Sequence, residues 1–183
     1  MNEYFKYLKT RSKLGILYRK IYLYPKIKNS TKNKKLDLGC GIGDYLHYDN
    51  KCIGLDINES CVDYCRSQGL NAYLMKIDEI PFKDNSFDTV IMDNVLEHIS
   101  DPSKILSEIE RVLNVKGILI IGVPCEKGYQ YDKDHKIFYE IKDLKKLMSS
   151  RYQLVNYFYT PPFCFIFRKY LRQVALYSVF QKI

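Results

Sequence analysis

The sequence contains no run of eighteen or more apolar residues, so we expect no helix that spans a membrane. Arg19 and Lys20 interrupt the apolar N-terminal stretch, which makes it a poor signal peptide. The six cysteines form no Cys-x-x-Cys pair and the three histidines form no pair at helical spacing, so we predict no metal site. These absences favour a cytoplasmic protein with reduced thiols.

Acidic residues are almost missing from the N-terminal part of the chain. Residues 1–35 hold eleven Lys and Arg against the single acid Glu3, whereas the remainder is slightly acidic. Aromatic and aliphatic residues are interleaved with Lys and Arg over residues 4–24, which predicts one or two amphipathic helices. We expect Pro25 to end them and Lys26–Lys34 to form a polar connector.

This contrast divides the chain into a basic amphipathic helical segment, residues 1–34, and a domain, residues 35–183. The basic segment could contact phosphate at a membrane surface or on nucleic acid. A solvated basic helix without a partner is the alternative.

Short apolar runs alternate with amphipathic stretches in the domain. We expect strands at residues 35–38, 51–55, 72–75, 87–92 and 118–123, with helices ending near Gln68 and starting near Pro102. This order predicts an α/β, Rossmann-like, doubly wound and mostly parallel seven-stranded sheet behind the N-terminal helical segment. Tyr152–Tyr159 alternates like a strand. Phe163–Phe167 fits either a last strand or the start of a helix through Phe180.

A glycine-rich loop follows the first expected strand. The three glycines of Gly39–Gly43 let the backbone turn tightly and approach a ligand. A dinucleotide site would need a further glycine at Asp44 or Leu46, and Asp44 would repel a pyrophosphate. Asp56 ends the second strand, where a carboxylate can accept hydrogen bonds from both ribose hydroxyls or cap the next helix. The pattern favours a ligand with a ribose and a cationic group.

Three segments of the sequence carry a family resemblance. Asp37–Gly43 reads D-L-G-C-G-I-G and resembles the D-x-G-x-G-x-G signature of the class I S-adenosylmethionine-dependent methyltransferases. Ile80–Asp88 and Asn94–His98 resemble the segments that precede and follow the fourth strand in that family. The resemblance runs from about Lys35 to Leu147 and implies S-adenosyl-L-methionine as cofactor, with S-adenosyl-L-homocysteine as product.

The resemblance also implies which residues contact the cofactor. Gly39 and Gly41 would flank its methionine part, in a loop with Cys40 and Gly43 that Asp37 orders. Asp56 would hold its ribose, Ile57, Lys76 and Ile77 would lie at its adenine, and Asp93 and Asn94 would approach its sulfonium and amino groups. His98 would have a structural or cofactor-contact role. Lys76 departs from the family, because many relatives have an acid there and lysine cannot accept a hydrogen bond. We therefore expect the backbone around Ile77, or Asp78, to contact the adenine edge.

The residues that act on the methyl acceptor should follow the fourth and fifth strands. His135 is the candidate general base, with Asp132, or alternatively Asp134, as the partner that orients its ring, in the polar-aromatic segment Pro124–His135. An exposed loop with a helix-capping Asp is the alternative. The basic segment and Gly128–Tyr139 resemble small bacterial methyltransferases of surface-polysaccharide and lipopolysaccharide synthesis, which implies a small-molecule or glycan acceptor with a sugar hydroxyl or amine.

Two other functions stay open. An RNA or protein methyltransferase could use the basic N-terminus to bind phosphate, although we find no recognisable RNA-binding module. A non-catalytic subunit could bind the cofactor and regulate a partner. We expect a cytoplasmic protein that contacts the inner membrane face through its basic termini, which include Arg168, Lys169 and Arg172.

Overall fold

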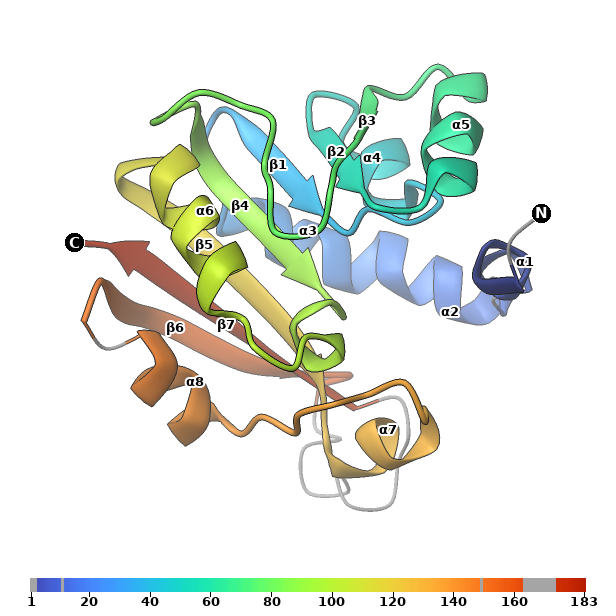
Figure 1. Cartoon of the computed structure of the whole chain (residues 1–183). Helices are drawn as coiled ribbons and strands as arrows, with labels where there is room; N and C mark the ends of the chain where they lie inside the picture. Colours follow the sequence, from blue (N-terminus) through green and yellow to red (C-terminus); the bar gives the residue numbers. More distant parts are fainter. Residues whose placement is uncertain (1–2, 11, 149, 163–173) are drawn as a thin grey trace.

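The computed structural model describes residues 3–10, 12–148, 150–162 and 174–183. Its seven strands form one sheet in the order β3-β2-β1-β4-β5-β7-β6 (Figure 1). The strands are β1 Lys35–Leu38, β2 Ile53–Asp56, β3 Ala72–Leu74, β4 Phe87–Asp93, β5 Leu113–Pro124, β6 Tyr152–Thr160 and β7 Ala175–Lys182. The first five run parallel, and β7 is antiparallel to both β5 and β6. The predicted mostly parallel α/β sheet is confirmed.

Helices cover both faces of this sheet (Figure 1). They are α1 Glu3–Lys9, α2 Lys13–Tyr18, η1 Arg19–Leu23, α3 Tyr24–Asn29, α4 Asp44–Tyr48, α5 Glu59–Ser67, η2 Leu96–His98, α6 Ser103–Val112, α7 Glu126–Tyr131 and α8 Ile141–Met148. Over the described part of the chain, none of them is long and apolar enough to cross a membrane. Helices α6 and α8 lie on one face, and α2, η1 and α3 run across the other.

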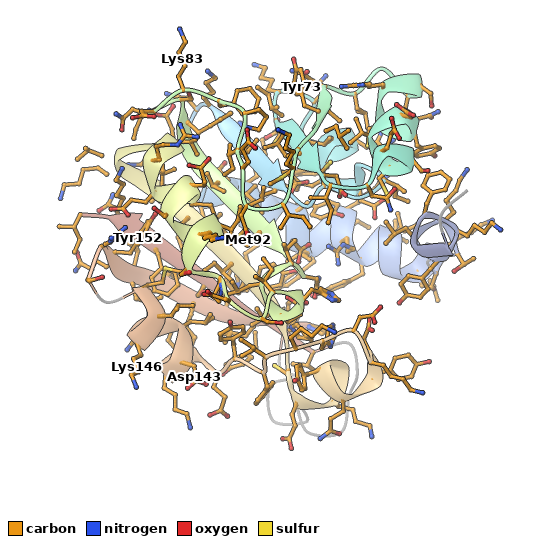
Figure 2. The ribbon with its side chains drawn as sticks, viewed as in Figure 1. Tyr73, Lys83, Met92, Asp143, Lys146 and Tyr152 are labelled. Carbon is orange, nitrogen blue, oxygen red and sulfur yellow. The ribbon has the colours of Figure 1, made fainter. Side chains whose placement is uncertain are left out.

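The core lies on both sides of the central strands because successive strand residues point to opposite faces. Val90 and Met92 of β4 join the cluster that contains Ile105 and Ile109 of α6. Ile91 between them joins the cluster on the other face. Figure 2 shows Met92 inside the molecule. Burying a side chain of this size stabilises the fold by about 1.5–3 kcal/mol.

The basic N-terminal segment is part of this core. Leu23, Tyr24 and Ile27 are buried against the sheet face that carries Ile91. The expectation that Pro25 ends the helical stretch is wrong, because Pro25 lies in the first turn of α3, and α3 continues directly from η1 in helical conformation. The predicted polar connector is therefore helical over residues 26–29.

Two further expectations need correction. A helix running through Phe180 is wrong, because β7 occupies Ala175–Lys182 and pairs with β5 over seven positions. The remainder of that alternative, residues 163–173, lies outside the described residues, as do Arg168, Lys169 and Arg172. The segment Pro124–His135 is not wholly a loop, since α7 spans Glu126–Tyr131. The strand expected at Tyr152–Tyr159 is confirmed by β6.

Candidate cofactor and acceptor site

A cavity of about 260 Å³ opens at the carboxyl ends of β1, β4 and β5. Ligands of open parallel sheets bind at this edge. The N-terminal helices, the glycine loop and the segment after β5 all contribute to the wall. The lining residues are Tyr7, Leu8, Arg19, Tyr24, Ile27, Asp37, Gly39, Cys40, Gly41, Asp44, Tyr45, Ile91, Asp93, Asn94, His98, Pro124, Gly128, Tyr131, Asp132 and His135.

The glycine loop packs closely against its surroundings. The N–H groups of Gly39 and Cys40 both donate to the carbonyl of Leu55 at 2.8 and 3.0 Å, which ties the loop to β2. Gly39 has φ +78°, and a Cβ there would lie 2.4 Å from Cγ2 of Val95. The position accepts only glycine for both reasons. The loop therefore leaves its backbone open to the cavity, as the methionine part of the cofactor requires.

Asp56 supports this loop from beneath. Its Oδ2 accepts a hydrogen bond from Gly41 N and its Oδ1 accepts one from Asn58 N, both at 2.8 Å. Burial raises the pKa of Asp56, and these N–H groups act in the opposite direction. Asp56 closes a turn onto the residue before α5 and bonds none of the N–H groups within that helix. Each carboxylate oxygen keeps a second lone pair for a ribose hydroxyl, and the ribose contact stays a prediction.

The predicted adenine residues lie on an open surface beyond β2 and β3. Ile57 is 59% exposed and Ile77 is 75% exposed. Lys76 pairs with Glu79 at 3.5 Å, so its ammonium group is turned toward an acid. The surface offers two apolar side chains for stacking, and the assignment of the adenine to it stays a prediction.

Asp93 is the most heavily bonded acid of the cavity. It forms an ion pair with Arg19 and accepts hydrogen bonds from Tyr177 Oη at 2.6 Å and from Asn94 Nδ2 at 3.0 Å. Sheet register explains the meeting, because Gly122 of β5 pairs with Asp93 on one side and with Tyr177 on the other. We call this line of three residues the Asp93–Gly122–Tyr177 row.

Sequence reasoning missed both Arg19 and Tyr177. Arg19 stood in the sequence as a charge inside an apolar stretch, which is the signal that could have marked it as buried and paired. Tyr177 gave no such signal, because its place beside Asp93 depends on β7 inserting between β5 and β6.

The electrostatics of this end fit a zwitterionic amino acid. Burial, together with Asp93 and other nearby acids, raises the pKa of Asp37 to about 8, and Arg19 acts in the opposite direction. Burial lowers the pKa of Arg19, but Asp93 raises it well above its usual value. A guanidinium for a carboxylate and two carboxylates for an ammonium and a sulfonium are the groups that the methionine part of S-adenosylmethionine needs. The residues present fit the cofactor.

The acceptor side of the cavity carries His98, Asp132 and His135. His135 lies in a loop whose residues Lys133, Asp134 and Lys136 are exposed, but its own side chain is only 8% exposed and its ring stacks on Tyr129. The carbonyl of Tyr129, 2.8 Å from His135 Nδ1, orients the ring. Asp132 Oδ2 lies 4.0 Å from the other nitrogen, Nε2, where it would stabilise the ring once that nitrogen is protonated, so the predicted orienting role of Asp132 belongs to Tyr129. The structure thus brings together the predicted catalytic pair and the predicted cofactor contact His98.

Glu97 joins this group and was missed by sequence reasoning. Its Oε1 lies 3.9 Å from His135 Nε2, and its side chain is 1% exposed. Burial, with weaker effects from Asp93 and Asp132, raises the pKa of Glu97 to about 8. Burial and the neighbouring His135 lower the pKa of His98. The signal available in the sequence was the position of Glu97 beside His98 in the segment Asn94–His98.

Comparison with known proteins gives the same answer as the geometry. Residues 36–121 match the family described as a methyltransferase domain. Two uncharacterized proteins of Methanocaldococcus jannaschii are 33% and 32% identical, over 73% and 60% of this chain but only 60% and 56% of their own length. A SAM-dependent methyltransferase from Archaeoglobus fulgidus superposes over 100% of both chains with a TM-score of 0.73 at 19% identity.

The sheet order, the glycine loop beneath the cavity and the domain match at residues 36–121 agree with one another. Residues 36–121 thus form a methyltransferase domain, the fold is that of solved SAM-dependent methyltransferases, and the residues of the cavity fit S-adenosylmethionine as the cofactor.

Proposed function

We propose that this protein transfers the methyl group of S-adenosylmethionine to a hydroxyl group of a small molecule or glycan, in surface-polysaccharide synthesis. One observation carries the proposal: a single cavity joins the glycine loop and Asp37 to the pair Asp132 and His135. Methyl transfer requires the acceptor to lie next to the methyl group of the cofactor, and this shared cavity would bring both reactants to Asp132 and His135. An amine acceptor is the alternative for the same cavity.

Bound cofactor supplies an electrophilic methyl group and leaves as a neutral thioether. The chain supplies position and a proton acceptor. His135 Nδ1 lies 2.8 Å from the carbonyl oxygen of Tyr129. A carbonyl can only accept, so Nδ1 carries the proton and Nε2 carries a lone pair. That lone pair can take the proton of an acceptor hydroxyl as its oxygen attacks the methyl carbon.

The acceptor class can be tested with isotopically labelled cofactor. We expect methylated product from nucleotide-linked or lipid-linked sugars and none from RNA. RNA is included because one relative is named as a tRNA methyltransferase, while another is named as a sterol methyltransferase. His135→Ala should lower turnover by about 10²–10⁴-fold and leave the affinity for the cofactor within about twofold. His47→Ala, on α4, is the matched control. Methylated RNA with no methylated sugar would contradict the acceptor class.

We also propose that the protein contacts the inner membrane face through its N-terminal helices. Leu14, Leu17 and Ile21 follow one another at helical spacing and are 78%, 52% and 69% exposed. Lys13 and Lys20 beside them are exposed as well. An exposed apolar stripe flanked by lysines is the arrangement of an interfacial amphipathic helix. Such contact would bring a lipid-linked acceptor close to the cavity.

A further inference from the structure

Glu97, His98 and His135 form a compact group at the acceptor side of the cavity. Glu97 and His98 lie in η2 after β4, and His135 lies after α7. The carbonyl of Glu97 accepts hydrogen bonds from Lys136 N at 2.7 Å and Ile137 N at 3.2 Å, which fastens the two segments to each other. One ligand atom from each of the three side chains lies within 4.8 Å of the others. The backbone thus fixes the separation of three potential metal ligands.

The Glu97 carboxylate has no partner that accounts for its burial. It is 1% exposed, and neither of its oxygens has a hydrogen-bond partner among the described residues. A buried carboxylate without a partner costs several kcal/mol, roughly, unless it is protonated or meets a cation. No Lys or Arg forms an ion pair with it in the described part of the chain. The carboxylate points instead toward His135 Nε2, 3.9 Å away.

The ring of His135 is held in a form that can bind a metal, and the ring of His98 lies beside it. His135 donates from Nδ1 to the carbonyl of Tyr129 at 2.8 Å, which leaves the lone pair of Nε2 free. Hydrogen bonding of one ring nitrogen to a carbonyl orients the other toward a metal in most histidine sites. The rings of His98 and His135 lie 4.7 Å apart, so one nitrogen of each can approach the same point in space.

We propose that Glu97, His98 and His135 bind one divalent first-row transition-metal ion at the acceptor end of the cavity. Two imidazoles and one carboxylate suit Zn²⁺, Fe²⁺ or Mn²⁺, and three protein ligands leave positions open for an acceptor oxygen. Ligand bonds of about 2.0–2.2 Å require the three side chains to move inward by roughly 1 Å. From the sequence we expected no metal site. That expectation considered only Cys-x-x-Cys pairs and histidine pairs at helical spacing, and neither pattern describes these three residues.

The metal would activate the acceptor hydroxyl for the proposed methyl transfer. This role rests on the proposed function. An acceptor hydroxyl bound to the ion loses its proton near neutral pH. Since His135 Nε2 is then a ligand, the proton passes to the half-exposed carboxylate of Asp132, 4.0 Å from that nitrogen. The acceptor oxygen bonds to the methyl carbon while the carbon–sulfur bond breaks. The electron pair of that bond stays on the sulfur of the thioether.

Metal binding is tested without any acceptor. Purified full-length protein is freed of metal with a chelator and titrated with Zn²⁺ in a calorimeter. We expect one ion per chain and at least tenfold weaker binding in Glu97→Gln and in His135→Ala. His47→Ala removes the one histidine outside the group and should bind Zn²⁺ like the wild type. No Zn²⁺ binding, or equal affinity in both site variants, would overturn the proposal.

A second measurement does not depend on the variants folding. Wild-type protein loaded with Co²⁺ should show two strongly shifted, exchangeable imidazole N–H signals in its proton spectrum, one from each histidine ligand. A Co²⁺ spectrum without such signals would also overturn the metal site.

The two proposals fail differently. If chelation leaves methyl transfer to a hydroxyl unaffected, the metal proposal is wrong and His135 remains the proton acceptor. If the protein binds one Zn²⁺ per chain but transfers no methyl group to any hydroxyl, the proposed acceptor is wrong and the metal site stands. Asp132→Asn separates the roles further, because it should lower turnover and leave Zn²⁺ affinity unchanged.

Discussion

Single residues of the cavity combine cofactor recognition with a cost in stability. Asp37 is the plainest example, because it is buried and other acids lie nearby. A carboxylate whose pKa is raised on folding favours the folded state least at high pH. We propose that the same carboxylate attracts a cationic group of the cofactor. The residue is therefore suited to binding rather than to folding.

The variant Asp37→Asn tests whether this residue lowers the stability of the fold and raises the affinity for the cofactor. The pKa of Asp37 is about 8 in the folded protein against 3.8 for an ordinary aspartate, so the wild type loses stability as pH rises from about 4 to 8. The variant lacks this titration. Its free energy of unfolding in urea should exceed that of the wild type by about 1 kcal/mol or more at pH 8, with no gain at pH 4.

Cofactor affinity should move in the opposite direction, falling at least tenfold in Asp37→Asn by calorimetry because an amide cannot neutralise an ammonium group. Equal loss of stability at pH 4 and pH 8 would instead show that Asp37 acts mainly by ordering the glycine loop.

At the scale of elements, the central strands hold the site together. The Asp93–Gly122–Tyr177 row spans β4, β5 and β7 and reaches Arg19 of η1 through the ion pair with Asp93. The middle residue of the row is a glycine, Gly122, because there is no space for a side chain at this position. A Cβ at this position would lie 2.5 Å from Cε1 of Tyr177 and 2.9 Å from Oδ1 of Asp93.

Gly122→Ala should separate Tyr177 from Asp93 and loosen the cavity. Overpacking of this kind costs about 1–3 kcal/mol, which thermal unfolding can measure, and cofactor affinity should fall with it. Gly15→Ala in α2 is the matched control, since a Cβ there meets only Ser12 Cβ at 3.9 Å. Alanine should stabilise that helix by up to about 1 kcal/mol. A Gly122→Ala protein as stable as the wild type would rule out this close packing.

At the scale of the whole molecule, the basic N-terminal helices have two faces. One face supplies Leu23, Tyr24 and Ile27 to the core and Arg19 to the cavity. The other presents the exposed stripe Leu14, Leu17 and Ile21. Removing the whole segment would damage the fold, so surface substitutions are the sharper test of membrane contact.

The double variant Leu14→Glu and Ile21→Glu should bind vesicles containing anionic lipid at least tenfold more weakly than the wild type. Losing two inserted apolar side chains and adding two negative charges both oppose binding. Cofactor affinity should stay the same, because neither residue lines the described cavity. Vesicle cosedimentation measures the effect. Equal binding by the wild type and the variant would favour a solvated helix without a partner.

The sequence by itself determined the parallel part of the sheet and the cofactor loop. Both depend on local patterns: short apolar runs and the glycine triplet of Gly39–Gly43 with Asp56 at the end of the next strand. Such signals need only neighbouring residues, so the strands at Lys35–Leu38 and Phe87–Asp93 follow from them closely.

Tertiary structure alone decided how distant residues meet. Arg19 and Tyr177 reach Asp93 from opposite ends of the chain, because β7 inserts beside β5 and the N-terminal helices cross the sheet. Glu97 and His98 meet His135 although α6, β5 and α7 lie between them in the sequence. Histidine spacing along one helix carries no information about such a group, because side chains that are brought together by strand order leave no periodic pattern in a sequence.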